Sequence, residues 1–483
     1  MSLPFSDHPG LIRLETSLRQ GLARLNHPPA AWTPEIAAPD GRPALDVLIV
    51  GGGMNGLAAA FALRRQGLHA IRQIDRRPAG LEGPWLTYAR MEMLRSPKHL
   101  TGPAMGIPDL TFRAWWEAQH GPSGWNALGF IRKEDWAAYL IWYGRATGAQ
   151  VENGVELTAL TPVGPFLRAD LRGPAGSETV HARQVVLASG REGQAVPRIP
   201  APFAAHLGAQ VRHSSEALDL PALRGRDVVA VGLSASAFDN ACAAAEAGAR
   251  VTLLGRADRL PTVNKMKQTV YPGFAEGFPD LPDAERLAWL RTVITARVAP
   301  PRHTVQRAAR AGVRLVLGAE PRVVSRVGDR LRIETPAGAV EADQVILGTG
   351  FRFDFAAPPE LADLGPRALL WRDVITEGPE DELLDCPALG PGFELRPRPG
   401  ADPAGLARLR VFTHAAQPSL GNLANDIPQA SEGASRLARA VARDLFLEDA
   451  AHHRARLEAY AEPELLGDEG LAPAGGAARA AAG

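Results

Sequence analysis

The 483-residue chain contains little cysteine and no long hydrophobic run. Its two cysteines, Cys242 and Cys386, are far apart and form no CxxC or CxxxxC pair, so we expect neither a structural disulfide nor a dithiol redox centre. No stretch of about 18 apolar residues occurs, which argues against a membrane-spanning helix. The first residues lack a basic region followed by an apolar core, so we expect a cytoplasmic protein.

The chain also lacks net charge and metal-binding motifs. Its 53 basic side chains balance 53 acidic ones, so the net charge gives no reason to expect nucleic acid or an anionic membrane as a partner. The 12 histidines include no HExxH motif, and we predict no metal site. The length suggests two or three domains with ample core.

A glycine-rich turn follows an apolar strand near the start. The strand occupies residues 46–50, and Gly51, Gly53 and Gly56 follow it before an alanine-rich helix. Gly51 permits a tight turn, Gly53 lets the backbone approach a pyrophosphate, and Gly56 permits close packing of the helix on the strand. The helix N-terminus offers free N–H groups and a positive dipole end to the phosphates.

An acidic residue completes this first signature. Asp75 ends the next apolar strand, where a carboxylate can accept hydrogen bonds from both hydroxyls of an adenosine ribose. The same carboxylate would repel a 2′-phosphate. The first signature therefore predicts a site for FAD or NAD.

A second signature begins at residue 227, again with strand, tight turn and small-residue helix. Gly232 is followed by Ser234 and Ser236 near the positions that glycines usually hold. The next strand ends before Arg256 and carries no acid, and a guanidinium at that place can bind a 2′-phosphate bidentately. We predict an NADPH site here; the alternative is an ordinary βαβ unit with a solvated arginine.

After residue 45 the chain resembles the flavin-containing monooxygenases and their Baeyer-Villiger and N-hydroxylating relatives. Besides the two signatures, the matching pieces are Gly83-Pro84-Trp85, the Leu-Ala-Ser-Gly run at 187–190, and Gly348-Thr349-Gly350. The resemblance implies FAD in the first site and NADPH in the second. It also implies that Trp85, Val155, Gly190 and Asp426 contact a cofactor, with Asp426 just before a helix that runs to Leu445.

The resemblance implies an α/β fold with two Rossmann-like domains, the NADPH domain being inserted in the FAD domain. An amphipathic helix and a proline-rich lead precede the core, and the last residues are of low complexity, which predicts a disordered tail. The predicted segments are an N-terminal extension (1–44), the first part of the FAD domain (45–196), the NADPH domain (197–343), the second part of the FAD domain with C-terminal helices (344–470), and the tail (471–483).

The activity that the resemblance implies is an FAD- and NADPH-dependent monooxygenation. One oxygen atom of O2 would enter a small organic substrate through a C4a-(hydro)peroxyflavin. Two alternatives stay open: an NADPH-dependent flavin reductase or dehydrogenase without oxygen transfer, and a non-catalytic protein that reuses the fold for binding. The expected partners are a small-molecule substrate and O2, without nucleic acid or membrane; a homodimer rests on analogy. The substrate could be an amine, sulfide, ketone or heterocycle.

Some segments depart from the family pattern. Where flavin-containing monooxygenases carry Asn followed by Ser-Ser-Lys near the flavin, this chain has Arg95-Ser96-Pro97-Lys98. If that loop covers the flavin, as the resemblance implies, Arg95 and Lys98 place positive charge beside the ring and are our candidate catalytic residues; the alternative is a solvated basic loop. His213 is either the family's histidine or a buried structural one. Trp136 and Tyr139 are expected in the core.

Overall fold

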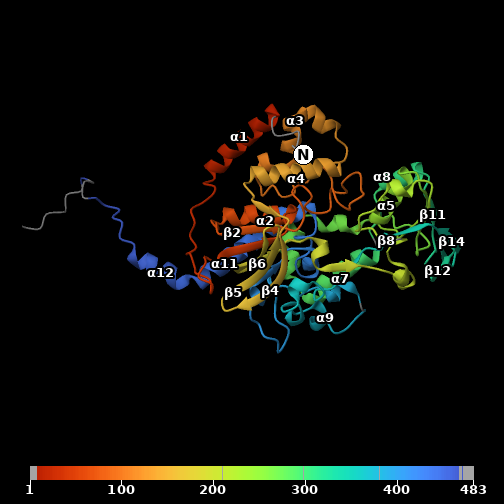
Figure 1. The fold of residues 1–483 in the computed structure, drawn as a ribbon. Coiled ribbons are helices and arrows are strands. Elements are labelled where there is room, and N and C mark those ends of the chain that lie inside the picture. Colours follow the sequence, from red (N-terminus) through yellow and green to blue (C-terminus); the bar gives the residue numbers. More distant parts are fainter. Residues whose placement is uncertain (1–7, 209, 297, 380, 467–469, 471–483) are drawn as a thin grey trace, which may run out of the picture.

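The computed structural model describes residues 8–208, 210–296, 298–379, 381–466 and 470. Figure 1 shows a large lobe, a smaller lobe that carries α5 and α8, and a C-terminal arm that extends away from the large lobe. The predicted disordered tail at 471–483 lies outside the described residues.

The large lobe is built on one mixed sheet. Its central strand β1 and the end of β6 are mostly apolar and buried, as expected for parallel strands covered on both faces. The order β3-β2-β1-β6-β17 is parallel, whereas β4, β5 and the first half of β6 form an antiparallel meander. The strands are β1 (Leu45–Val50), β2 (Ile71–Asp75), β3 (Val151–Asn153), β4 (Glu156–Val163), β5 (Phe166–Gly173), β6 (Gly176–Leu187) and β17 (Leu409–Val411).

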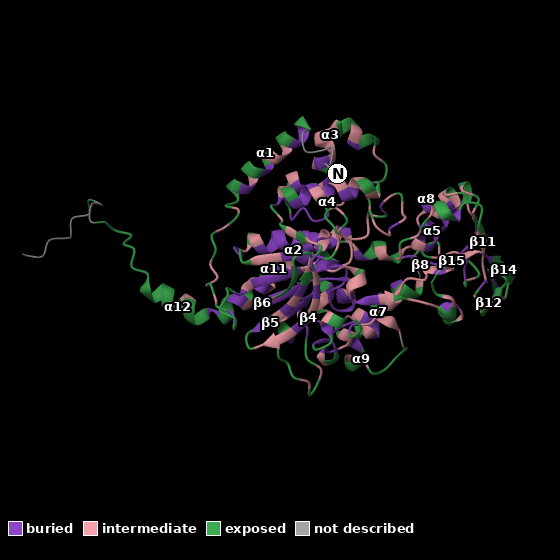
Figure 2. Cartoon of the chain, in the orientation of Figure 1, coloured by how far each residue is buried: buried purple, intermediate pink, exposed green. Residues whose placement is uncertain are grey.

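Helices cover this sheet and bury most of its apolar surface (Figure 2). The alanine-rich α2 contacts α11, and α1 contacts α3. Leu11, Leu18 and Leu22 of α1 join the main core, so the predicted amphipathic helix forms and the N-terminal extension belongs to the large lobe. The helices are α1 (Pro9–Arg24), α2 (Met54–Arg65), α3 (Phe112–Ala127), α4 (Lys133–Ala146), α9 (Trp371–Val374), α10 (Gln417–Leu420) and α11 (Ala430–Glu448).

The small lobe is inserted between two strands that pair with each other. β7 (Ala195–Pro197) leads into it, β16 (Phe351–Phe353) leads out, and the two run antiparallel. Its parallel sheet has the order β11-β10-β9-β15-β8 and lies beside the antiparallel sheet β12-β13-β14. The elements are β8 (Val211–His213), β9 (Asp227–Val231), α5 (Ala235–Glu246), β10 (Arg250–Leu254), α8 (Arg302–Arg310), β11 (Arg314–Val316), β12 (Val323–Val327), β13 (Arg330–Thr335), β14 (Gly338–Ala342) and β15 (Gln344–Leu347).

The inserted domain differs from the predicted range at both its end and its middle. β15 lies between β9 and β8 in the small sheet, so the domain continues to Leu347 and does not end at residue 343. The segment with α6 (Pro272–Gly277) and α7 (Asp283–Ala296) packs its apolar side chains on the large lobe, in a cluster with Trp371. The end of the domain and the packing of α6 and α7 both depend on contacts between segments that are distant in the sequence.

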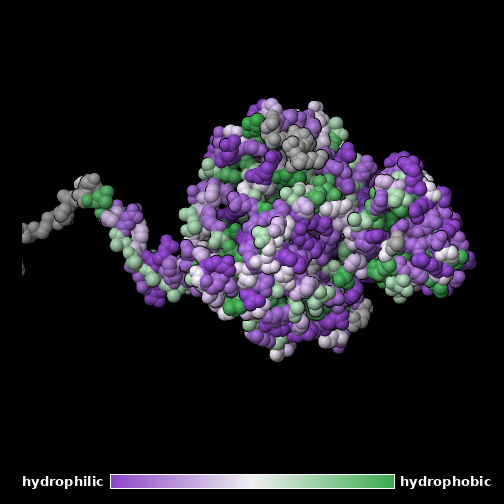
Figure 3. All heavy atoms as spheres, viewed as in Figure 1, coloured by the Kyte–Doolittle hydropathy of each residue, from purple (hydrophilic) through white to green (hydrophobic). Residues whose placement is uncertain are grey.

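The surface matches a protein whose apolar side chains are mostly inside. Hydrophilic residues cover most of the face in Figure 3. The arm formed by α12 (Ala450–Ala459) has no buried residue. Among the described residues, no helix combines the length and the apolar character needed to cross a bilayer.

Candidate active site at the two nucleotide turns

The first glycine turn is shaped by close backbone contacts. The Gly51 N–H donates to the Ile74 carbonyl at 2.8 Å, and the φ of Gly51 is +122°. A Cβ at Gly51 would lie 2.4 Å from the Ala188 carbonyl oxygen, and a Cβ at Gly56 would lie 1.9 Å from the Gly51 carbonyl oxygen. Packing of strand and helix therefore requires both glycines, with or without a ligand.

Gly53 is different, because the protein itself leaves space around it. The atoms nearest to a Cβ at this position lie 3.9 Å away, in Gly83. Gly53 caps the start of α2 and directly precedes its first residue, so the unpaired N–H groups of the first helical turn lie beside this space. The fold does not require glycine here, whereas a pyrophosphate at the helix N-terminus would.

Asp75 ends β2 beside the same turn. Its carboxylate accepts the Gly52 N–H and the Arg77 N–H, each at 2.7 Å. These bonds hold the carboxylate at the edge of the nucleotide turn and leave lone pairs for two ribose hydroxyls. A cavity of about 220 Å³ beside Gly52 and Gly53 is lined in part by Trp85.

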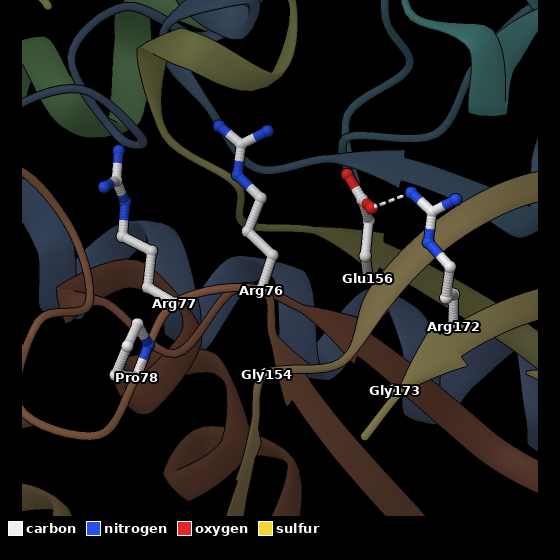
Figure 4. Close-up of a pocket in the computed structure, with 7 residues that line it drawn as sticks. All are labelled: Arg76, Arg77, Pro78, Gly154, Glu156, Arg172 and Gly173. Carbon is white, nitrogen blue, oxygen red and sulfur yellow. Dashed lines mark hydrogen bonds and ion pairs between the residues drawn. The ribbon is translucent and has the colours of Figure 1, made fainter. Parts of the chain in front are cut away.

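An open hollow of about 530 Å³ lies just beyond Asp75 (Figure 4). Arg76 and Arg77 extend from the end of β2 on one side, and the ion pair of Arg172 with Glu156, at 2.6 Å, lies on the other. The hollow adjoins Asp75, the carboxylate that we predicted to bind a ribose. The adenosine end of a dinucleotide held at Asp75 would therefore lie near polar side chains.

Val155, Trp85 and Gly190, which we also predicted to contact a cofactor, differ in whether their atoms are free to meet a ligand. The Val155 N–H donates to the Asp75 carbonyl at 3.0 Å and its side chain is buried, so the amide is already engaged within the protein. Trp85 is half-buried and meets the Trp136 ring edge to face at 6.3 Å. Gly190 has a φ of +69° and open space at its Cβ position, as a residue beside a ligand would.

The segment between β17 and α11 contains buried polar atoms without partners. Among the described residues, His414 Nδ1, Asn425 Oδ1 and Gln429 Oε1 make no hydrogen bond although they are shielded from solvent. Buried polar atoms normally have partners, and the polar edges of a bound flavin would supply them. Together with the open space at Gly53, these atoms fit FAD.

Asp426 lies in the same segment. Its carboxylate accepts the Ile427 N–H at 2.9 Å, which caps a short helical turn. Burial raises the pKa of this carboxyl to about 6. At mildly acidic pH a fraction of the protein molecules therefore carries a protonated Asp426, whereas an exposed aspartate would be fully ionised.

Arg191 follows the hinge glycine directly, and the sequence analysis missed it. Its side chain is exposed to solvent, yet surrounding protein lowers its pKa by desolvation. The guanidinium lies 5.8 Å from the centre of the Phe351 ring, so it lies beside β16, the strand that leads out of the small lobe.

The second turn follows the backbone path of the first with different side chains. The Gly232 N–H donates to the Leu254 carbonyl at 2.9 Å, and the φ of Gly232 is +128°. A Cβ at Gly348 would lie 2.5 Å from the Ala237 Cα, so the helix and strand are in close contact at Ala237. Ala237 therefore occupies the position in this turn that corresponds to Gly56 in the first.

The two serines of this turn face different neighbours. Ser234 is the exposed residue at which α5 begins, and its hydroxyl lies 3.4 Å from the Gly348 carbonyl. The Ser236 hydroxyl donates to the Ser214 hydroxyl at 3.5 Å. Arg256 follows β10 and is exposed, in a position to meet a 2′-phosphate.

Comparison with known proteins places the chain in a family. Residues 45–271 match the family model for pyridine nucleotide-disulphide oxidoreductases. An FAD-dependent urate hydroxylase of Xanthomonas campestris pv. campestris is 40% identical over 93% of this chain and 95% of its own length. The chain belongs to the flavin-dependent monooxygenase family.

Solved structures agree with this fold. The ornithine N-hydroxylase of Kutzneria sp. 744 has a TM-score of 0.65 at 17% identity, covering 83% of the monooxygenase described here and 100% of its own chain. The L-lysine 6-monooxygenase of Pseudomonas syringae has a TM-score of 0.63 at 20% identity, with 83% and 99% covered. Both likenesses concern the fold.

The predicted class of enzyme and its cofactors are confirmed at the level of the family. The monooxygenase is an oxidoreductase that uses FAD and NADPH with a small-molecule substrate and O2. Bound FAD would supply the chemistry of hydride acceptance from NADPH and of reaction with O2. Cys242 and Cys386 are both buried and free, so the chain carries no dithiol of the kind that the name of the family model implies.

The basic loop of the monooxygenase places its two charges differently. The Lys98 ammonium donates to the Trp125 carbonyl at 2.6 Å and the Leu128 carbonyl at 2.5 Å, at the C-terminal end of α3. The ammonium charge thus stabilises the carbonyl end of that helix. We had predicted this charge beside the flavin, but here it is bound to the two carbonyls. Arg95 is half exposed and forms an ion pair with Asp239 of α5 at 3.2 Å.

The remaining predicted residues are structural. His213 is buried, with Nδ1 at 2.8 Å from the Ser215 hydroxyl and Nε2 at 2.9 Å from the Gly350 carbonyl. It therefore joins β8 to the second hinge. Trp136 and Tyr139 are 1% and 0% exposed, as expected for core residues.

Proposed function

We propose that the monooxygenase hydroxylates urate or a closely related planar, anionic heterocycle. The observation that carries this proposal is the 40% identity to an FAD-dependent urate hydroxylase, which extends over 93% of this chain and 95% of the relative. The two N-hydroxylating structures reach 17% and 20% identity, so their amine substrates have a weaker claim.

The charge of Arg191 supports an anionic substrate. Arg191 lies beside Phe351 of the strand that leads out of the small lobe, and desolvation by the surrounding protein lowers the pKa of its guanidinium. A poorly hydrated cation attracts an anion more strongly than it would in water. Urate is a monoanion at neutral pH, whereas an aliphatic amine is a cation that Arg191 would repel.

We further propose that the large-lobe turn holds FAD and the small-lobe turn NADPH. Gly53 and Asp75 would hold the pyrophosphate and ribose of FAD, and the polar atoms of His414, Asn425 and Gln429 would meet the flavin. Trp85, Gly190 and Asp426 remain candidate contacts of FAD. Ser234, Ser236 and Arg256 remain those of NADPH, and Gly232 supplies the turn.

The protein side chains then orient the substrate, exclude water and accept hydrogen bonds, while the cofactors supply the redox chemistry. Arg191 orients the anion by its charge, and the surrounding side chains exclude water from the reacting centre. His414 is kept neutral because burial lowers its pKa well below the usual value, so it can accept a hydrogen bond at Nδ1. Lys98 has no part in this proposal, because its ammonium is bound to two carbonyls.

The test is oxygen transfer with a defined substrate. Purified enzyme with FAD and NADPH is supplied with urate under 18O2, and urate loss, NADPH oxidation and H2O2 are measured together. We expect one NADPH per urate, 18O in the product and little H2O2. A matched assay with an aliphatic diamine should give NADPH oxidation without product.

Other outcomes would overturn the proposal. Hydroxylation of the diamine and not of urate would place this enzyme with the N-hydroxylating branch. NADPH oxidation that ends entirely in H2O2 with urate and with related oxopurines would favour the reductase alternative. An Arg191→Met variant should raise the KM for urate by about 10-fold or more while leaving flavin content intact, since a charge-assisted contact contributes about 1.5–3 kcal/mol.

A further inference from the structure

The loop at residues 88–98 of the large lobe contacts the start of the nicotinamide-nucleotide helix in the small lobe. Arg95 Nη2 lies 3.2 Å from Asp239 Oδ2, and Asp239 is one turn inside α5, which begins at the turn containing Ser234. The pair therefore joins this loop of the large lobe directly to α5, the helix that follows the second nucleotide turn.

The two partners differ in burial. The Asp239 side chain is 4% exposed, whereas that of Arg95 is 44% exposed. Burial raises the pKa of the Asp239 carboxyl, and Arg95 is the first of the charges that oppose this rise. A carboxylate this deeply buried is unfavourable without a partner, so Arg95 does more for Asp239 than a surface ion pair would.

Neighbouring contacts of the same loop hold the backbone of the small lobe. The Arg90 guanidinium donates to the Ser214 carbonyl at 2.8 Å and the Glu216 carbonyl at 2.9 Å. Ser214 in turn contacts Ser236 at the start of α5. Arg307 of the small lobe donates to the Arg90 carbonyl at 3.4 Å. The loop therefore contacts α5 through Arg95 and the segment before α5 through Arg90.

We propose that Arg95 and Asp239 form a positioning pair, which sets the distance between the nicotinamide nucleotide on α5 and the flavin. The pair does not touch the reacting atoms. Hydride transfer takes two electrons and one proton from NADPH, leaves NADP⁺ and reduces the flavin, and its rate falls steeply when donor and acceptor are about 1 Å out of place. Binding of NADPH depends on contacts elsewhere on the turn and on Arg256.

The expected signature is a loss in rate without an equal loss in affinity. In anaerobic stopped-flow experiments, Asp239→Asn and Arg95→Met should each slow flavin reduction at saturating NADPH by about 10- to 100-fold. The NADPH dissociation constant should change by less than about 3-fold, because the contacts to the nucleotide are kept. Arg95→Lys keeps a charge and should recover part of the rate.

A double variant decides whether the residues act together. Arg95→Met with Asp239→Asn should be no slower than either single variant, because breaking the pair once removes its whole effect. Arg132→Met is the matched control: Arg132 is 58% exposed, lies on the same lobe and pairs at 3.5 Å with Glu134 in its own segment. This variant should reduce its flavin at the wild-type rate.

Several results would overturn the proposal. An unchanged reduction rate in Arg95→Met, or in the double variant with Asp239→Asn, would do so; the double variant leaves no unpaired carboxylate buried at this position. A large loss in Arg95→Met with none in Asp239→Asn would mean that Arg95 acts on a cofactor directly. Flavin content and the thermal midpoint identify a misfolded variant. The readout needs no substrate, so failure here is distinguishable from failure of the urate proposal.

Discussion

The two nucleotide turns follow the same backbone path with different side chains. The turn glycines Gly51 and Gly232 donate to the ends of the neighbouring strands at 2.8 and 2.9 Å. The residues after the hinge strands, Ala188 and Gly348, donate back to Val50 and Val231 at the same two distances. The turns are therefore equivalent position by position.

The two turns carry glycine and alanine in opposite places, one on the helix and the other at the hinge. The large lobe has glycine on the helix, at Gly56, and alanine at the hinge, at Ala188, whereas the small lobe has Ala237 on the helix and Gly348 at the hinge. In the small lobe the close contact joins Ala237 to Gly348, whereas in the large lobe Gly56 lies against the Gly51 carbonyl. Each helix therefore has a small residue where it comes closest to the neighbouring backbone.

The residues that distinguish the nucleotides follow the same alignment. Because Ile74 and Leu254 both accept from the turn glycines, Asp75 corresponds to Gly255 and Arg76 to Arg256. The small lobe therefore lacks a carboxylate where the large lobe has one. This difference supports the proposal that the second turn, and not the first, takes an adenosine 2′-phosphate.

The largest expected effect comes from breaking the helix contact in the large lobe. Gly56→Ala would put a methyl group 1.9 Å from the Gly51 carbonyl oxygen, which backbone movement alone can relieve. We expect a loss of more than about 3 kcal/mol in unfolding free energy and little bound FAD. Urea unfolding and the flavin absorption of the purified protein measure both quantities.

The control for this prediction is Ala237→Gly in the small lobe. It enlarges the contact and should cost about 1 kcal/mol, the usual penalty for glycine in a helix. A Gly56→Ala protein with full FAD and wild-type stability would show that the two contacts are not equivalent.

The next effect concerns the choice of nicotinamide nucleotide. Arg256→Ala should raise the KM for NADPH by about 10- to 100-fold, because a charged contact to the 2′-phosphate contributes about 1.5–3 kcal/mol. The KM for NADH should stay within about 2-fold of the wild-type value. Steady-state kinetics with both nucleotides test this, and an equal rise for NADH would mean that Arg256 does not read the phosphate.

A smaller effect separates ligand space from packing space in the large lobe. Gly53→Ala adds a methyl group whose nearest protein atoms are 3.9 Å away, so the protein should fold with wild-type stability. The same methyl group would crowd the pyrophosphate, and we expect FAD affinity to fall by about 10-fold, which corresponds to about 1.4 kcal/mol. Fluorescence titration of the apoprotein measures it; unchanged affinity would place the pyrophosphate elsewhere.

The smallest effect is a pH dependence of stability at Asp426. Its pKa is raised from 3.8 to about 6 in the folded protein, so the folded state binds the proton more tightly than the unfolded state does. Stability is therefore lost as the pH rises from about 4 to about 6, by up to about 3 kcal/mol at 1.36 kcal/mol per pKa unit.

Asp426→Asn removes this penalty and keeps the helix cap, since asparagine caps as well as aspartate. The variant should have a higher thermal midpoint than the wild type at pH 7.5 and an equal one at pH 4. A variant that is less stable at pH 7.5 would show that the ionised carboxylate has a partner that stabilises it.

Local signals in the sequence were sufficient for much of the fold. Strand, turn and helix at Gly51 and Gly232 are contiguous, and so are the hinges at residues 187–190 and 348–350. Each of these units is shaped by neighbours in the chain, so its residue pattern predicts it. The amphipathic pattern of α1 is of the same kind.

What the sequence did not reveal depends on contacts between distant residues. Ala237 is recognisable as the close-packing residue only beside Gly348, and Lys98 meets carbonyls that follow it by 27 and 30 residues. Arg191, which follows the first hinge, meets Phe351, which follows the second. No local pattern encodes such contacts, because tertiary packing creates them.

The most direct test of the division between the two turns compares Asp75→Asn with Arg256→Ala in one experiment. Flavin content is measured first, and the rates of anaerobic flavin reduction by NADPH and NADH follow. We expect Asp75→Asn to lose FAD while its flavin-loaded fraction keeps the wild-type preference for NADPH, and Arg256→Ala to keep FAD while losing that preference. A changed nucleotide preference in Asp75→Asn, or a loss of FAD in Arg256→Ala, would contradict the account.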